Sequence, residues 1–131
     1  MFTNHPSLPV SGGDSDCDLE LAAKKTAISS FTNQGEVCLC TERIFVERPI
    51  FDKFLERLIH YTKTMYPVGD PSKKETKFGA LVGKAHYNEV VSYVERAIEQ
   101  GAEVQLGWTK TCEEVRKMPG YFFPPTILTN V

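Results

Sequence analysis

The chain is 131 residues long, with 41% hydrophobic and 24% charged residues, a composition that fits one globular domain and excludes a disordered or fibrous protein. Its 15 basic and 17 acidic residues are scattered and give a formal net charge of −2, so neither nucleic acid nor a membrane surface is an expected partner. No apolar run reaches the roughly 20 residues of a membrane-spanning helix, and residues 1–9 do not resemble a secretory signal. We therefore expect a soluble, cytoplasmic chain with free cysteines.

The first part of the chain is expected to pass from an irregular lead-in into a helix. Residues 1–15 contain prolines, glycines and no periodicity, which predicts an extended lead-in. Asp16 and Asp18 favour a helix N-terminus, and we predict a helix from about Asp18 to Thr32. Gly35 is typical of the left-handed turn that closes a helix. The connection after it contains Cys38.

The middle of the chain predicts a strand, a helix and a loop. Arg43 to Glu47 contains a short β-branched and aromatic run that is typical of a buried strand. Pro49 then opens an amphipathic helix. Its apolar positions recur at three- and four-residue steps and are Phe51, Phe54, Leu55, Leu58, Ile59 and Thr62. The segment Pro67 to Lys77, with a glycine, two prolines and several charges, is expected to form a surface loop.

The last part of the chain predicts another helix and strand. A helix is expected from Lys84 to Gln100, stopped by Gly101. Its apolar stripe consists of Tyr87, Val90, Val91, Val94, Ala97 and Ile98. A strand with alternating side chains is predicted from Ala102 to Leu106, and a polar loop from Trp108 to Met118. The ending, Gly120 to Leu128, is expected to be extended, and its two prolines exclude a central position in a sheet. Helices and strands in this order imply an α/β layer arrangement.

The sequence around Cys38 carries the most specific motif in the chain. The segment FTNQGEVCLCTER, residues 31–43, resembles the cysteine signature of the aldehyde dehydrogenase superfamily, FxNxGQxCxAxxR. The resemblance continues in the family's order through RIFVERPIFDKFLERL, VGDP, FGALVGKAH, GAEVQLG and YFFPPTILTNV, and so covers about Asp14 to Val131. With Glu36 and the Cys38-Leu39-Cys40 triplet, the signature is most similar to the branch that oxidises 2-aminomuconic and hydroxymuconic semialdehydes.

This resemblance implies both a fold and a chemistry. It implies that residues 16–131 are part of an aldehyde dehydrogenase-like α/β catalytic domain, incomplete, with helices packed on a mainly parallel sheet, and that 1–15 is the lead-in. It further implies that the Cys38 thiolate attacks an aldehyde carbonyl, that the thiohemiacetal gives hydride to NAD or NADP, and that water releases the thioester as a carboxylic acid. The implied partner is a small-molecule aldehyde, and the parent enzyme is expected to be a homo-oligomer.

The chemistry of the residues alone leaves alternatives open for the cysteines. A thiol reaches a substrate carbon best from an exposed turn, and the Cys38 backbone N–H could help hold an oxyanion. A buried, passive thiol is the alternative interpretation. Cys40 is either a resolving thiol or a packing residue, and without further ligands these two sulfurs do not predict zinc. Cys17 and Cys112 match no role in the family.

His86 lies in the FGALVGKAH stretch, which in the family approaches the cofactor ribose. It is therefore a candidate cofactor contact, with a solvated histidine on the polar face of a helix as the alternative. Glu20 imitates the LELGG motif that carries the family's water-activating glutamate, but it lies too close to Cys38 for that identification. We expect the chain to lack that glutamate, the Gly-rich dinucleotide-binding segment and the EEIFGP segment, so that the cofactor is bound mainly by regions absent from this chain.

Three functions remain open on the sequence. The first is part of an NAD(P)-dependent aldehyde dehydrogenase that uses Cys38 as its nucleophile. The second is a noncatalytic domain that binds a partner through an exposed apolar helix stripe, at Phe51/Leu55 or Val90/Val94. The third is a thiol-based redox protein that uses Cys38 and Cys40. The first accounts for the whole pattern and is the one that the sequence favours.

Overall fold

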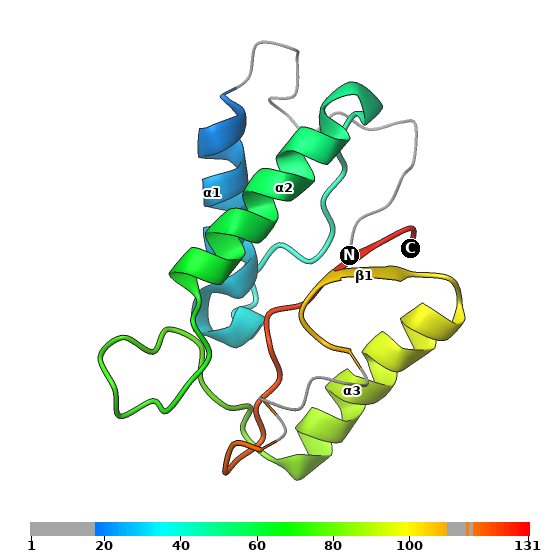
Figure 1. The fold of residues 1–131 in the computed structure, drawn as a ribbon. Coiled ribbons are helices and arrows are strands. Elements are labelled where there is room, and N and C mark those ends of the chain that lie inside the picture. Colours follow the sequence, from blue (N-terminus) through cyan, green and yellow to red (C-terminus); the bar gives the residue numbers. More distant parts are fainter. Residues whose placement is uncertain (1–17, 110–114, 116) are drawn as a thin grey trace.

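Three α-helices and a pair of short strands make up the part of the chain that this computed structural model describes, which is residues 18–109, 115 and 117–131. In chain order the elements are α1 (Leu19–Phe31), the 3-10 turn η1 (Thr32–Gly35), α2 (Arg48–Met65), α3 (Lys84–Glu99), β1 (Glu103–Leu106) and β2 (Ile127–Thr129). Helices α1 and α2 lie side by side, and α3 lies on the other side of β1 (Figure 1). The expected lead-in, 1–15, is outside the described residues.

The helices begin and end close to where the sequence predicts. Asp18 caps α1, since its Oδ1 accepts from Leu21 N at 3.0 Å and so satisfies one of the amides that a helix start leaves free. Pro49 lies in the first turn of α2, where its missing N–H has no consequence. Gly101, at φ +105°, follows the end of α3. The three predicted helices are therefore confirmed to within a residue or two.

The two strands pair antiparallel. Glu103 lies opposite Thr129 and Val104 opposite Leu128, with a bulge between Val104 and Leu106. The strand predicted at Ala102 to Leu106 is confirmed. The helices and small sheet of the incomplete α/β fragment that the resemblance implied are present, but the sheet of the described residues is one antiparallel pair rather than a mainly parallel one. The parallel pairing among these residues is one isolated bridge, Val68 to Phe78.

The buried strand predicted over Arg43–Glu47 is wrong. Ile44 forms a single bridge there, and the apolar residues of the run are half-buried rather than buried. Ile44 and Val46 pack instead against the cluster that α1 and α2 form. A β-branched run fits a strand locally, but a strand also needs a neighbour along its length, which local pattern does not reveal.

Two apolar cores lie on opposite sides of the strand pair. The α1–α2 core consists of Ala23, Ala27, Phe54, Leu58 and Ile127. The α3 core consists of Leu81, Val94, Ala97, Ala102, Trp108, Phe123 and Leu128. Adjacent residues of a strand point to opposite faces, which is why Ile127 serves one core and Leu128 the other. This helix–strand–helix layering is the α/β arrangement that the sequence predicts.

Trp108 corrects the prediction of a polar loop from 108 to 118. Its side chain is 1% exposed and stacks on Phe123 with ring centroids 5.0 Å apart. The chain turns inward at Gly107, which has φ +94° and where a Cβ would overlap the Pro125 carbonyl oxygen. Residues 110–114 and 116 lie outside the described residues. Trp108 therefore belongs to the α3 core rather than to a surface loop.

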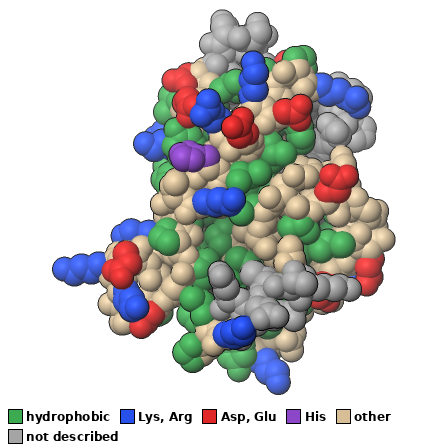
Figure 2. Space-filling model, viewed as in Figure 1, with side chains coloured by type: hydrophobic (Ala, Val, Ile, Leu, Met, Phe, Trp, Pro, Cys, Tyr) green, Lys and Arg blue, Asp and Glu red, His purple; other side chains and the backbone are tan. Residues whose placement is uncertain are grey.

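The surface carries mixed charges and few exposed apolar stripes. Acidic and basic side chains are interspersed on the face shown in Figure 2, and the loop at 67–77 projects from the body (Figure 1). The stripes that were candidates for partner binding are mostly packed within the chain: Val94 is buried in the α3 core, and Leu55 packs against the α1–α2 core. None of the helices in the described part of the chain combines the length and hydropathy needed to cross a bilayer.

Candidate functional site

The signature turn, residues 32–40, follows directly from the end of α1. Asn33, Gln34 and Gly35 all have positive φ, at 51°, 59° and 76°. Gly35 is required here, because a Cβ at this position would lie 3.0 Å from the Ser30 carbonyl oxygen in addition to the cost of the left-handed conformation. The three residues reverse the chain and carry it away from the helix axis. The prediction of a left-handed Gly35 that ends this helical stretch is confirmed.

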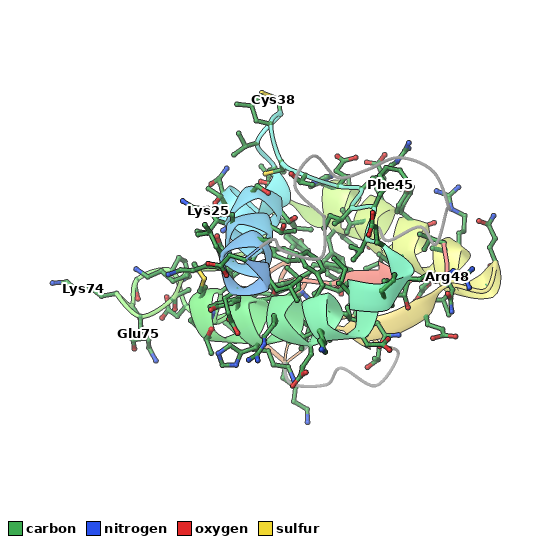
Figure 3. All side chains as sticks on the ribbon, turned by 90° about the horizontal axis from the view of Figure 1, so that it is seen from above. Lys25, Cys38, Phe45, Arg48, Lys74 and Glu75 are labelled. Carbon is green, nitrogen blue, oxygen red and sulfur yellow. The ribbon has the colours of Figure 1, made fainter. Side chains whose placement is uncertain are left out.

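Cys38 lies at the outer end of this turn. The Cys40 amide donates to the Val37 carbonyl at 2.8 Å and closes the turn around Cys38 and Leu39. The Cys38 side chain is exposed and points away from the body of the molecule (Figure 3). Among the described residues its backbone N–H donates to no acceptor, so an amide and a thiol are presented together. An exposed turn is the setting that the sequence predicts for a nucleophile.

Cys40 takes a different position from Cys38. Its thiol is half-buried and donates to the Thr32 carbonyl at 3.6 Å. It lines a groove of about 900 Å³ whose other walls include Glu36, His86 and Tyr93, whereas Cys38 is not part of the lining. This local partner favours the packing interpretation of Cys40. Cys17 and Cys112 lie outside the described residues.

The signature turn rests on aromatic side chains and on the segment before α3. Phe31, Tyr66 and Phe78 form a cluster with ring centroids 6.0–6.4 Å apart. In the amide orientation that satisfies both of its polar groups, Gln34 Oε1 accepts from Gly79 N at 2.8 Å. The signature turn is therefore held against Phe78 and Gly79, which lie more than forty residues later in the sequence.

His86 meets the signature turn through Glu36. Its Nε2 lies 3.2 Å from Glu36 Oε1, and its Nδ1 lies 3.9 Å from Glu89 Oε2. The sequence singled out both His86 and Glu36, but separately, and did not predict that they would pair. The signal that the sequence offered is position 36 itself, where this chain has glutamate and the family signature has glutamine. A carboxylate in place of an amide favours a partner that is charged or donates a hydrogen bond.

Glu20 has a structural role in the first turn of α1, at the opposite end of this helix from the signature turn. Its carboxylate pairs with Arg57 Nε at 2.9 Å and accepts from the Tyr61 hydroxyl at 2.7 Å. The hydrogen bond to Glu20 raises the pKa of the Tyr61 phenol above its ordinary value. Glu20 thus links α1 to α2.

Comparison with known proteins identifies the family. A model of the aldehyde dehydrogenase family matches residues 14–131. The chain belongs to this family. The 2-aminomuconic semialdehyde dehydrogenase of Homo sapiens is 42% identical over 118 residues, which cover 88% of this chain and 24% of that protein. The 4-trimethylaminobutyraldehyde dehydrogenase A of Danio rerio is 40% identical over 116 residues. The chain thus spans about a quarter of the length of these aldehyde dehydrogenases.

Solved structures of aldehyde dehydrogenases share the fold of this chain. The aldehyde dehydrogenase KauB from Pseudomonas aeruginosa superposes with a TM-score of 0.76 at 40% identity, over 87% of this chain and 22% of that one. An indole-3-acetaldehyde dehydrogenase bound to NAD+ superposes with a TM-score of 0.77 at 36% identity over the same shares. The described elements therefore form part of an aldehyde dehydrogenase fold, as the signature implied.

Proposed function

We propose that the protein to which these residues belong oxidises a small aldehyde, of the semialdehyde class, to its carboxylic acid with NAD or NADP, and that Cys38 is its nucleophile. The observation that carries the proposal is the signature turn, which in a chain of this family presents an exposed thiol and a backbone amide that bonds to none of the described residues. The semialdehyde class is supported by the muconic semialdehyde dehydrogenases among the relatives. The cytoplasmic location and the homo-oligomeric parent are part of the same proposal.

In the proposed reaction the Cys38 thiolate attacks the aldehyde in the first step and is released as a free thiol in the last. Attack by its thiolate forms a carbon–sulfur bond and moves the carbonyl electron pair onto oxygen, where the Cys38 N–H can donate. Loss of hydride from the resulting thiohemiacetal leaves a thioester, and water cleaves the thioester to the carboxylic acid and the free thiol. The nicotinamide cofactor, when bound, supplies the hydride acceptor.

The surroundings of His86 limit what this chain contributes to cofactor binding. Carboxylates face both ring nitrogens of His86, from Glu36 and Glu89. These acceptors suit a ribose hydroxyl better than a phosphate, since carboxylates accept hydrogen bonds and repel anions. We propose that NAD(P) is held mainly by regions outside these residues, with His86 as a contact at the ribose side.

Selective alkylation tests the assignment of Cys38. The 131-residue chain is treated with iodoacetamide at neutral pH, and the four cysteines are followed by peptide mapping. Cys38 is expected to react fastest, because it alone occupies the outer end of the signature turn, while Cys40 is half-buried. Cys40→Ser should leave this reactivity in place and serves as the matched control. Uniform labelling of all four thiols would contradict the proposal.

NADH formation tests how much of the reaction these residues support. Without further segments we expect none from a semialdehyde and NAD+, because hydride has no bound acceptor. NADH formation that Cys38→Ser abolishes would show that the 131 residues suffice for the whole reaction and would overturn the proposal that other regions hold the cofactor.

A further inference from the structure

The Cys38 thiol is not held in place by a partner of its own. Its sulfur makes no hydrogen bond within residues 18–109, 115 and 117–131, and its neighbour Leu39 is 85% exposed. Cys38 lies at the end of a turn that projects from the molecule (Figure 3). A nucleophile has to be held within a narrow range of positions to meet a substrate carbon. The position of Cys38 is therefore set by the backbone of the signature turn.

Two short hydrogen-bonded turns follow one another inside the signature turn. The Glu36 amide donates to the Asn33 carbonyl at 3.1 Å, and the Cys40 amide donates to the Val37 carbonyl at 2.8 Å. Both hydrogen bonds are local, so they fix the path of the backbone but not how the turn sits on the rest of the molecule. Its orientation depends on the contacts that hold its two sides.

The side that follows Cys38 is tied to the C-terminal part of α1. The Thr41 amide donates to the Ser29 carbonyl at 3.0 Å, and the hydroxyl oxygens of the same two residues lie 3.0 Å apart. These two contacts between Thr41 and Ser29 are named the neck clasp. Beside it the Cys40 thiol donates to the Thr32 carbonyl. The neck clasp thus joins a residue after the signature turn to one before it.

The side that precedes Cys38 is held by a different part of the chain. There Gln34 and Glu36 contact Gly79 and His86, which belong to the segment before α3 and to its first turn. The two sides of the signature turn are therefore fixed independently, one to α3 and one to α1. Without the neck clasp the side that follows Cys38 is free to move while the other side stays in place.

We propose that Thr41 is a positioning residue for Cys38, which acts by holding the end of the signature turn against Ser29. Its amide and its hydroxyl both contact Ser29, so it narrows the range of positions that the thiol occupies. This role rests on the proposed function of Cys38 as nucleophile. Position 41 is one that the cysteine signature FxNxGQxCxAxxR leaves unspecified.

A distance measurement tests this role. The chain contains one tryptophan, Trp108, which is buried in the α3 core. A dansyl acceptor is attached through an iodoacetamide group to Cys38, in a chain whose other three cysteines are replaced by serine, and the time-resolved fluorescence of Trp108 gives the distribution of the distance to the label. Thr41→Val removes the hydroxyl at nearly constant shape and should broaden this distribution. Thr41→Ser keeps a hydroxyl and should restore the original width.

The half-buried Cys40 thiol provides a second measurement in the chain that retains all four cysteines. Opening of the neck exposes this thiol, so Thr41→Val should speed its alkylation by iodoacetamide about two- to tenfold, the worth of one hydrogen bond. Ser29→Ala removes the other hydroxyl and should have both effects, so the test does not depend on one variant. Thr64→Val is the matched control: its hydroxyl donates to the His60 carbonyl at 2.9 Å near the end of α2, and its loss should change neither measurement.

The possible outcomes separate this proposal from the proposed function. An unchanged distance distribution or Cys40 rate in whichever of Thr41→Val and Ser29→Ala folds would overturn the positioning role. Equal broadening in Thr64→Val would do the same, since general loosening would then explain the effect, and so would a Thr41→Ser chain as broad as Thr41→Val. The assignment of the nucleophile depends instead on selective alkylation of Cys38 in the original chain, and loss of that selectivity with a normal distance distribution would contradict the proposed function alone.

Discussion

Three consecutive residues with positive φ determine where Cys38 is presented. Asn33 and Gln34 adopt the left-handed conformation that glycine tolerates best. Gly35 has the highest φ of the three, and a Cβ there would lie 3.0 Å from the Ser30 carbonyl oxygen. The turn therefore stores backbone strain directly beside the candidate nucleophile. The surrounding contacts of Gln34 and Glu36 hold the turn in this conformation.

Gly35→Ala should destabilise the chain by about 1–3 kcal/mol, because alanine adds left-handed strain and a 3.0 Å contact with the Ser30 carbonyl oxygen. Urea unfolding followed by circular dichroism measures the change. Gly101→Ala is the matched control: Gly101 also has positive φ, but its Cβ would meet nothing within 4 Å. A larger loss for Gly101→Ala than for Gly35→Ala would contradict this account of the turn.

The elements show which parts of the fold can be predicted from sequence. Helices α2 and α3 are predicted because their apolar stripes repeat at helical spacing. Helix α1 is predicted because Asp18 marks its start and Gly35 closes the 3-10 turn that follows its end. The strand at Arg43–Glu47 was predicted wrongly: within residues 18–109, 115 and 117–131 the apolar residues of this run are half-buried and Ile44 alone forms a bridge. The pairing of Glu36 with His86 could not be predicted, because it joins side chains that tertiary packing brings together.

The cap of α1 is a testable contribution of one side chain to an element. Asp18→Ala should lower the free energy of unfolding by about 1 kcal/mol, since the Leu21 amide loses its acceptor and the helix start loses a favourable charge. Asp18→Asn keeps an acceptor oxygen and should lose less. Thermal unfolding of the three chains compares them, and equal losses for the two variants would show that the hydrogen bond is not the stabilising feature.

The molecule as a whole is organised around the strand pair that separates the two cores. Leu58 lies in the α1–α2 core, and Trp108, the one tryptophan of the chain, lies in the α3 core. Ile127 and Leu128 contribute one side chain to each. Because both cores are built on the same two strands, we expect them to unfold together.

Leu58→Ala tests this cooperativity. Removing a fully buried leucine side chain should lower the free energy of unfolding by about 2–5 kcal/mol. The fluorescence of Trp108 reports on the other core, so its urea midpoint should fall together with the midpoint from circular dichroism. A Trp108 midpoint that stays in place while the helical signal is lost at lower urea would show two independent units.

The position of Ile127 and Leu128 has a consequence for how this fold forms. The ribosome releases the chain from its N-terminal end, so α1, α2 and α3 are all made before the two residues that close the cores. Helices α1 and α2 can pack on each other before then, but the contacts that β2 makes with both cores join residues far apart in sequence, which slows folding. Completion of both cores therefore waits for two adjacent side chains on β2, which follow in sequence the cysteine on which the chemistry is proposed to depend.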